Sequence, residues 1–213
     1  MPNATTTPFP TAQLGNLTTA ASAFGMTITA RESAVLSGAL QVSGSVPASD
    51  AGQPVAIEFL GRRTGWVWQT ATQATALTDG TYVAVWNPNL VGKFAVRALV
   101  GQAGGATIAA SMPTISVTVY RASVATLFGP GLYGRRTACG TILRRWTIGV
   151  AHRTLPCGTR VAIYYGGRTV TVPVIDRGPY ANGANWDLTM ATGKLVGMTE
   201  TETIGAAPFP TAP

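Results

Sequence analysis

The sequence is poor in charge, in histidine and in cysteine. Of its 213 residues, 11% are charged and 46% are hydrophobic, while His152 is the one histidine and there are two cysteines. Structural zinc sites generally take four nitrogen or sulfur ligands. The sequence therefore predicts no metal site, and no motif in it points to a cofactor.

Long apolar runs are also missing. No stretch approaches the roughly 20 apolar residues that a helix needs to cross a membrane, so no membrane span is expected. The opening residues, MPNATTTPFPTAQL, lack a basic n-region and an apolar h-region, so we expect no signal peptide in this sequence. The 25 glycines and 14 prolines favour short strands joined by turns over long helices.

The positive charge is concentrated in the second half of the chain. The formal net charge is +7; residues 1–119 hold five basic and four acidic residues, and residues 120–213 hold ten basic and four acidic ones. A cationic domain favours an anionic partner through long-range attraction. No recognition helix, zinc spacing or stacking-sheet signature accompanies the charge, so nucleic acid is not the expected partner.

The two cysteines, Cys139 and Cys157, are close in sequence. A disulfide between them would stabilise the fold by about 3 kcal/mol in the chain-entropy treatment and would place the protein in an oxidising, extracytoplasmic setting. Two buried free thiols are the alternative.

The first half of the chain predicts a β-sandwich. Residues 1–25, rich in Thr, Ala and Pro, are expected to form a flexible leader. From residue 26 to 120, apolar residues recur with a period of two, as in TYVAVW (81–86), and Asp79-Gly80 is a hairpin signal. This segment has no cysteine, which excludes an antibody-type disulfide, and we interpret it as an immunoglobulin-like spacer.

A second domain is expected over residues 122–207, after a short hinge. Its predicted strands are 160–165, 168–176 and a last one near 203–207, with one short helix over 188–198. Residues 208–213 are expected to be a tail. They include a second copy of the PFPTA segment found at 8–12, for which the sequence offers no physical account.

Four motifs in this second domain, in order, resemble one family. They are FGPGLYGRRTA (128–138), VAHRTLP followed by CGTRV (150–161), DRGPY (176–180), and DLT (187–189) followed by an alanine-containing helix. This order is similar to the RlpA-like family of septal-ring wall proteins, and the cysteine pair resembles its disulfide-bearing actinobacterial branch.

The resemblance implies an all-β chain whose second domain is a six-stranded double-psi β-barrel. Some members of the family are lytic transglycosylases acting on peptidoglycan without stem peptides, whereas related expansin barrels loosen walls without hydrolysis. In lytic cleavage a general acid protonates the glycosidic oxygen and the 6-hydroxyl of the sugar attacks, so one carboxyl group can suffice where hydrolases use two.

Two residues are predicted to carry the chemistry. Asp176 ends a valine-rich strand before a Gly-Pro turn, and we expect it to be the acid/base, provided that Arg177 does not pair with it. An Asp-turn role, accepting the amides of residues 177 and 178, is the alternative. His152 matches the histidine of the family's active site and is expected to assist.

Two further positions bear on catalysis. Asp187 matches an aspartate in the groove of expansin barrels, but capping the following helix is slightly favoured. Lytic members carry a glutamate where this chain has Thr141, and a threonine hydroxyl does not act as a general acid at neutral pH. Arginines and aromatic rings are expected to contact anionic groups and sugar faces. The predicted substrate-binding residues are Asp187, Tyr133, Tyr180, Trp186, Arg136, Arg153 and Thr141.

The resulting hypothesis is a secreted, monomeric protein that remodels peptidoglycan with its C-terminal barrel. The alternative is a non-catalytic wall-binding or expansin-like module, which Thr141 favours. A third possibility is a virion or surface component that docks on a host wall.

Overall fold

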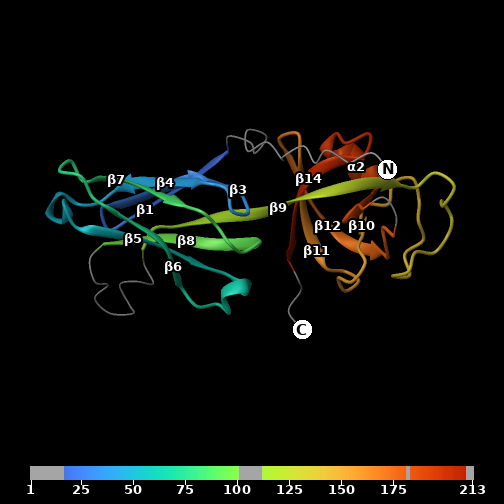
Figure 1. Cartoon of the computed structure of the whole chain (residues 1–213), viewed down its shortest axis with the longest axis horizontal. Helices are drawn as coiled ribbons and strands as arrows, with labels where there is room; N and C mark the ends of the chain where they lie inside the picture. The colour runs from blue at the N-terminus through green and yellow to red at the C-terminus, as the bar shows by residue number, and fades with distance from the viewer. Residues whose placement is uncertain (1–16, 101–111, 181–182, 210–213) are drawn as a thin grey trace. The chain divides into compact units, whose positions relative to one another are not determined.

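The computed structural model describes residues 17–100, 112–180 and 183–209. The chain divides into two compact units, one ending at Val119 and the other beginning at Tyr120 (Figure 1). Residues 1–16 of the predicted leader, which include the first PFPTA segment, lie outside the described residues.

Two antiparallel sheets form the first unit. Sheet 1 has the order β1-β2-β4-β7, and sheet 2 has β6-β5-β8-β9 with β3 paired to β9. The bounds are β1 (Thr18–Ala23), β2 (Met26–Arg31), β3 (Ser33–Val35), β4 (Leu40–Ser45), β5 (Pro54–Leu60), β6 (Gln69–Thr75), β7 (Thr81–Trp86), β8 (Gly92–Val100) and β9 (Thr114–Phe128), with short 3-10 turns η2 (Ala48–Asp50) and η3 (Arg62–Thr64).

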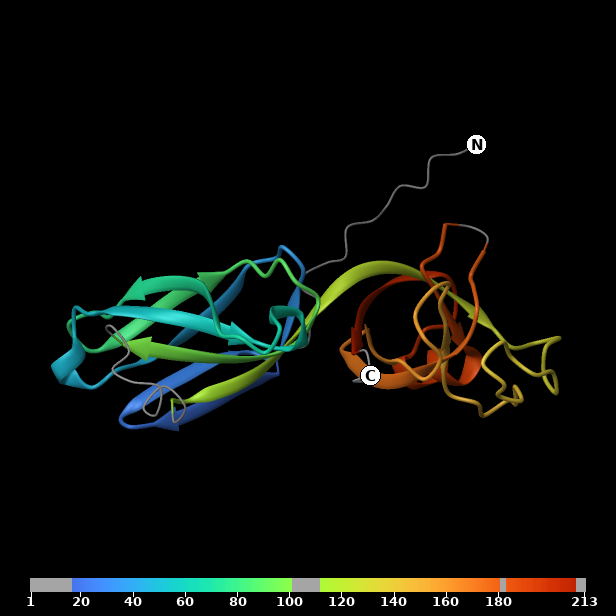
Figure 2. The ribbon, with the colours of Figure 1, turned by 90° about the horizontal axis from the view of Figure 1, so that it is seen from below.

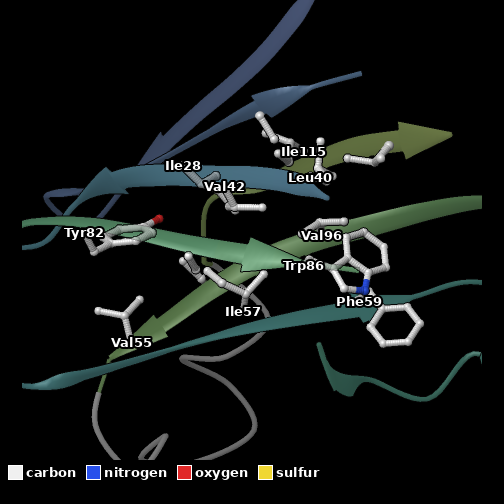
Figure 3. Close-up of a cluster of buried hydrophobic side chains, with 14 of the residues drawn as sticks. Ile28, Leu40, Val42, Val55, Ile57, Phe59, Tyr82, Trp86, Val96 and Ile115 are labelled. Carbon is white, nitrogen blue, oxygen red and sulfur yellow. The ribbon is translucent and has the colours of Figure 1, made fainter. Parts of the chain in front are cut away.

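The period-two pattern places the apolar residues between these sheets, as expected. Val55, Ile57 and Phe59 of β5 are buried, and they face side chains such as Val42 and Trp86 from sheet 1 (Figure 3). The ring of Phe59 lies 5.0 Å from that of Trp86 and 5.5 Å from that of Phe94, which fixes one end of the core. The sandwich prediction is confirmed, and its immunoglobulin-like character stays a prediction.

The sandwich begins earlier than the sequence indicated. β1 lies inside the range assigned to the leader and pairs with β2 from Thr18↔Arg31 to Ala23↔Met26. Its side chains alternate between exposed and half-buried, and most are alanine or threonine. A strand made of such small residues has too weak an apolar alternation to be found by pattern.

Six strands form the second unit: β9, β10 (Val150–Ala151), β11 (Arg160–Tyr165), β12 (Arg168–Asp176), β13 (Trp186–Thr189) and β14 (Glu202–Phe209). Their order is β13-β10-β12-β11-β14-β9, and β13 also pairs with β9, so the sheet closes into a barrel (Figure 2). Two of the pairings, β13 with β9 and β10 with β12, are parallel.

Two predicted boundaries, the hinge and the start of the C-terminal tail, differ from those in the structure. The predicted hinge at residues 119–122 lies within β9, whose residues pair with β8 up to Val119 and with β14 from Arg121. β14 continues to Phe209, so the predicted tail begins inside a strand. In both places β-branched or aromatic residues continue the strand beyond the composition change that suggested a boundary.

One short helix, α2 (Met190–Val196), follows β13. The side chain of Thr189 caps it by accepting the amide of Thr192, and Gly197 ends it with a left-handed φ of 82°. Among the described residues, no helix is long and apolar enough to cross a membrane.

A glycine in β4 gives a test of the sandwich packing. A Cβ atom at Gly44 would overlap the carbonyl oxygen of Thr27, to which the Tyr82 hydroxyl donates at 2.8 Å. We expect Gly44→Ala to lower the free energy of unfolding of the sandwich by about 2–3 kcal/mol, measured by urea denaturation. Ser43→Ala, on the same strand, is the control; equal midpoints for the two variants would contradict this packing.

Candidate functional site

A row of four residues crosses four adjacent strands of the barrel. Thr126 of β9 is paired with Asp187 of β13, Asp187 with Ala151 of β10, and Ala151 with Asp176 of β12. Paired residues project to the same side of a sheet. The two carboxylates therefore flank Ala151, with their Cα atoms about 10 Å apart, the width of two strand spacings.

This row lies on the outer side of the barrel wall. The neighbours of Asp187 along β13, Trp186 and Leu188, are buried in the barrel core, so Asp187 projects the opposite way. The register between β10 and β12 shifts after Val150, which is opposite Val174, so that Ala151 lies opposite Asp176. Such irregularities re-aim a side chain next to functional sites.

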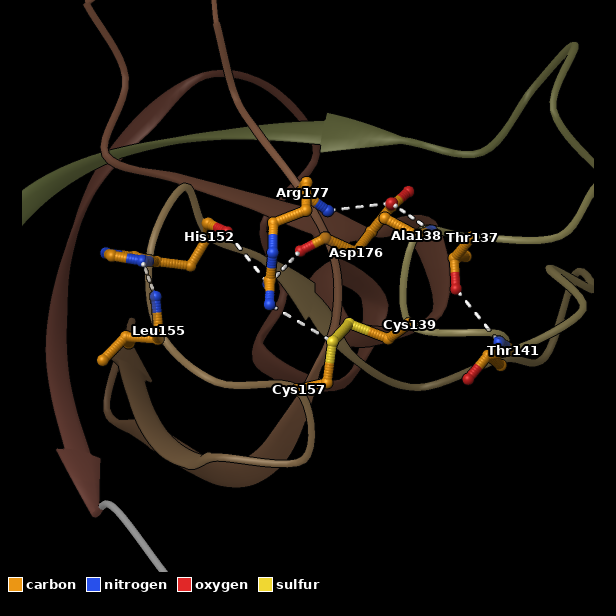
Figure 4. Close-up of a disulfide and its surroundings, with 9 residues drawn as sticks. All are labelled: Thr137, Ala138, Cys139, Thr141, His152, Leu155, Cys157, Asp176 and Arg177. Atoms are coloured by element: carbon orange, nitrogen blue, oxygen red, sulfur yellow. Dashed lines mark hydrogen bonds between the residues drawn. A yellow bond between two sulfur atoms is a disulfide. The ribbon is translucent and has the colours of Figure 1, made fainter.

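Asp176 is held by backbone amides. Its Oδ1 accepts the N–H of Ala138 at 2.9 Å and that of Arg177 at 2.8 Å (Figure 4). The second of these is the local turn contact that the sequence suggested as an alternative role, but the first comes from a segment 38 residues away. Neither bond uses Oδ2, and the residue is half-buried.

Arg177 does not neutralise this carboxylate. Its guanidinium group donates to the backbone oxygens of His152 and Asp176, each at 3.4 Å, and to the Sγ of Cys157 at 3.3 Å. Figure 4 shows the guanidinium on the side of the disulfide, away from the Asp176 carboxylate. The guanidinium group of Arg177 therefore does not pair with the Asp176 carboxylate, as an acid/base role for Asp176 requires.

Asp187 is half-buried and carries its own hydrogen bond. Burial raises the pKa of its carboxyl group, and the negative charge of Asp176 raises it further, while a hydrogen bond from Thr126 acts in the opposite direction. The Thr126 hydroxyl donates to Oδ1 of Asp187 at 2.8 Å. The two acids of the row are thus electrostatically linked, and Asp187 holds its proton to higher pH than an ordinary aspartate does.

The slightly favoured capping role for Asp187 is wrong. The helix starts at Met190, and the capping oxygen belongs to Thr189, two residues after Asp187. Because β13 continues to Thr189, Asp187 is a strand residue, and its carboxyl group accepts from the Thr126 hydroxyl instead. The sequence motif contains two capping residue types, Asp and Thr, and only strand pairing decides between them.

His152 is oriented by backbone groups. Its Nδ1 accepts the amides of Thr154 at 3.2 Å and Leu155 at 3.1 Å. Burial lowers the pKa of the imidazole, and the charges of Arg153 and Arg177 lower it further. The hydrogen-bond network thus assigns a neutral ring whose proton is on Nε2, which makes His152 a hydrogen-bond donor.

The imidazole does not contact Asp176. In Figure 4 the ring and the Asp176 carboxylate lie on opposite sides of Arg177. The ring instead packs on Trp186 with 4.5 Å between centroids. Trp186 is 5% exposed, so the structure places it in the core, beneath His152, and not as an open platform for a sugar.

The predicted disulfide is confirmed. Cys139 and Cys157 are bonded, with 5.6 Å between their Cα atoms. The bond joins the segment containing Ala138, which binds Asp176, to the segment that follows His152 (Figure 4). It therefore holds together the two chain segments that orient the predicted catalytic residues.

Thr141 occupies a tight turn beside this disulfide. Its amide donates to Oγ1 of Thr137 at 3.1 Å, and its carbonyl accepts the Thr137 amide at 2.8 Å. Arg136 closes the same turn by donating to the carbonyl of Gly140 at 2.8 Å. The structure thus shows both residues ordering a loop, and their contribution to substrate binding stays a prediction.

The remaining predicted residues are Arg153, Tyr180 and Tyr133. Arg153 donates to the carbonyls of Pro179 and Ala184, both at 2.6 Å, and so braces the loop that carries Tyr180. Tyr180 is 78% exposed. Tyr133 is half-buried, with the Arg145 guanidinium 5.8 Å from its ring centre. Of the three predicted stacking residues, Tyr180 and Tyr133 remain available to a ligand.

Thr126 could not be identified from the sequence. It precedes Asp187 by 61 residues and belongs to none of the four motifs, so no local signal identifies it; only the pairing of β9 with β13 does. Within the described residues, no group of three or more metal-ligating side chains comes together.

Comparison with known proteins identifies the family of the barrel. A family model described as "Lytic transglycolase" matches residues 121–208. A probable endolytic peptidoglycan transglycosylase RlpA of Synechocystis sp. is 39% identical over 80 residues, and one of Aquifex aeolicus is 40% identical over 81. The C-terminal unit is an RlpA-like double-psi β-barrel.

The RlpA-like match leaves most of each relative uncovered. The aligned part is 37% of this chain in both cases, and 25% and 36% of the two relatives. An endolytic peptidoglycan transglycosylase RlpA of Campylobacter jejuni is 35% identical over 77 residues, 35% of this chain and 28% of that relative. A solved structure, the Streptomyces papain inhibitor, aligns over 40% of this chain and 90% of its own, at 25% identity and a TM-score of 0.33.

Removing the disulfide tests its role in the RlpA-like barrel. The Cys139→Ser/Cys157→Ser double variant is expected to lose about 3 kcal/mol of barrel stability, because the bond closes a loop of 18 residues. Urea denaturation of the wild type with and without reductant provides the matched comparison. Midpoints that do not change in either experiment would contradict a stabilising bond.

Asp187 makes the stability of the barrel dependent on pH. Because its folded pKa lies above the unfolded value of 3.8, the folded state binds the proton more tightly, and stability falls as pH rises above about 4. We expect Asp187→Asn to be more stable than the wild type at pH 7 and the difference to vanish below pH 4, measured by denaturation. Glu200→Gln, an exposed carboxylate, should show no such crossover; a destabilised Asp187→Asn at pH 7 would refute the raised pKa.

Proposed function

We propose that the barrel cleaves peptidoglycan glycan strands as a lytic transglycosylase, with Asp187 as the general acid. The observation that carries this proposal is the strand row that places half-buried Asp187, bonded to Thr126, on the same face as Asp176, where burial and the charge of Asp176 raise the pKa of Asp187. Pairs of carboxyl groups whose environments separate their protonation behaviour are typical of sites that move protons onto and off sugars.

The proton transfer follows from the row. Protonated Asp187 gives its proton to the glycosidic oxygen, and the C1–O bond breaks as positive charge develops at C1. The 6-hydroxyl of the same sugar then attacks C1, and its proton passes to the Asp187 carboxylate, which restores the acid. No water molecule takes part, so the products are a 1,6-anhydro sugar and a free 4-hydroxyl.

Asp176 and His152 support this step in different ways. Asp176 keeps a negative charge close to Asp187, which raises the pKa of Asp187, and that charge stabilises the positive charge at C1. His152 donates an Nε2–H hydrogen bond to a substrate oxygen, since its Nδ1 is occupied by two amides. The sequence suggested Asp176 as the acid. The proposal assigns that role instead to Asp187, on the other side of Ala151.

The substrate class rests on the relatives and on charge. Two of the matched relatives are named as probable endolytic peptidoglycan transglycosylases, and the third as an endolytic peptidoglycan transglycosylase. Ten basic and four acidic residues in 120–213 suit a polymer that carries carboxylates. We infer action outside the cytoplasm, with which the disulfide is consistent. No nucleic acid, membrane span or partner subunit enters the proposal.

A wall-binding module without catalysis is the second candidate. Thr141 favours it, because lytic members of the family are expected to have a glutamate at this position. The structure places Thr141 in a turn near the disulfide (Figure 4), on a different segment from Asp187. Our proposal requires that Asp187 suffices as the acid without a carboxyl group at position 141.

Digestion of purified peptidoglycan, with and without stem peptides, tests the proposal. Mass spectrometry should detect 1,6-anhydro-muramyl ends with the wild type. Asp187→Asn should reduce their rate of formation by about 10²–10⁴-fold, the usual contribution of general acid catalysis, while Glu200→Gln should match the wild type.

Two outcomes would overturn it. Undiminished activity of Asp187→Asn would return the acid role to Asp176, for which Asp176→Asn is run in parallel. No anhydro product from the wild type, with protein still pelleting on insoluble wall, would establish the binding module.

A further inference from the structure

The sandwich carries an exposed tryptophan in an unusual position. Trp66 is 68% exposed and has a left-handed φ of 61°, which large side chains rarely adopt. Two hydrogen bonds hold the turn: the Trp66 amide donates to the Gly61 carbonyl at 3.0 Å, and the Gly61 amide to Oγ1 of Thr64 at 3.1 Å. Such conformations persist where the surroundings fix them, and they cluster at ligand sites.

The other tryptophan of this loop, in contrast, contacts a neighbouring side chain. Trp68 stacks on Arg97, whose Cζ lies 3.9 Å from the ring centre. Arg97 in turn donates to Oε2 of Glu58 from Nε at 2.9 Å and from Nη2 at 2.8 Å. Trp68 is therefore engaged within the protein, whereas the ring of Trp66 faces solvent.

A hollow of about 400 Å³ lies beside Trp66 on the outer face of sheet 2. Leu60, Ala95 and Ser116 line it and form one cross-strand row over β5, β8 and β9. The short side chain of Ala95 at the centre of the row makes the depression between its larger neighbours. The base of the turn packs tightly here, because a Cβ at Gly61 would press on Lys93 and Phe94.

The charge at this hollow is positive. Lys93 lines it, and Arg62 and Arg63 are exposed in the adjoining turn η3. None of the described residues lining it is acidic, and Glu58 on the same face is already bonded to Arg97. An anion at the hollow therefore meets attraction with no carboxylate in the lining to repel it.

We infer that this hollow binds a glycan whose sugars carry carboxylate groups. The apolar C–H face of a pyranose ring packs on the indole of Trp66, the hydroxyl of Ser116 meets the sugar's hydroxyls, and the Lys93 ammonium meets the carboxylate. Peptidoglycan strands without stem peptides fit this description, because each muramic acid then has a free lactyl carboxylate. The inference stands whether or not the barrel cuts the strand.

Oxidation of tryptophan by N-bromosuccinimide tests directly whether a ligand covers Trp66. In the full chain carrying Asp187→Asn, which should leave strands intact, Trp66 and Trp146 start equally accessible at 68% and 71% exposure. Peptide mass spectrometry follows each residue with increasing soluble stem-peptide-free strands. We expect saturating strands to slow the oxidation of Trp66 about tenfold, and Lys93→Gln to require about tenfold more ligand. Neutral chitooligosaccharides should protect Trp66 only at higher concentration.

Variants at the site give an independent readout. Trp66→Asn tolerates the left-handed backbone and should weaken binding of the strands about tenfold, whereas Trp66→Phe should retain most of it. Val67→Ala, at an exposed residue of the same turn, should bind like the wild type. The inference is overturned if Trp66 reacts equally fast with and without strands, if only Trp146 is protected, or if neutral and charged glycans protect equally. Protection of Trp66 without anhydro products from the wild type would reject only the proposed function.

Discussion

The parallel pairing of β13 with β9 is the interaction on which the candidate site depends. It closes the barrel, and it places Thr126 beside Asp187 so that the hydroxyl donates to the carboxyl group. On the other edge of β13, β10 sets Ala151 between Asp187 and Asp176. A small residue at that position leaves the two acids close enough for the charge of one to raise the pKa of the other. Strand pairing on its two edges thus gives Asp187 both the Thr126 hydrogen bond that lowers its pKa and the neighbouring charge of Asp176 that raises it.

The loops around this row are held by backbone contacts and one covalent bond. Asp176 accepts the amide of Ala138, the disulfide joins the next residue to the loop after His152, and Arg153 spans the ends of the loop containing Tyr180. Several residues that the sequence suggested as ligand contacts therefore hold other parts of the site in place. Trp186 is the clearest case, because it is buried and supports the imidazole of His152.

Much of the architecture could be predicted from the sequence. Period-two alternation identified the sandwich strands, four ordered motifs identified the RlpA-like barrel, and two nearby cysteines identified the disulfide, since each of these signals is local.

The missed features are non-local. The relation of Asp187 to Thr126 and Asp176 depends on strand neighbours 61 residues before it and on a register shift in β12. β1 was missed because threonine and alanine give little alternation. The hollow beside Trp66 lies over Ala95, between Leu60 and Ser116 of one cross-strand row, which only the pairing of β5, β8 and β9 reveals.

The proposed mechanism requires that Asp187 keeps its proton to a higher pH than an ordinary aspartate, because of burial and the nearby charge of Asp176. The most direct test is a carbon-13 NMR titration of the aspartate carboxyl groups, with Asp187 assigned by its loss in Asp187→Asn. We expect Asp187 to titrate above the ordinary value of 3.8 and its pKa to fall in Asp176→Asn. An Asp187 carboxyl group that titrates at or below 3.8 and does not respond to the loss of Asp176 would rule out this mechanism.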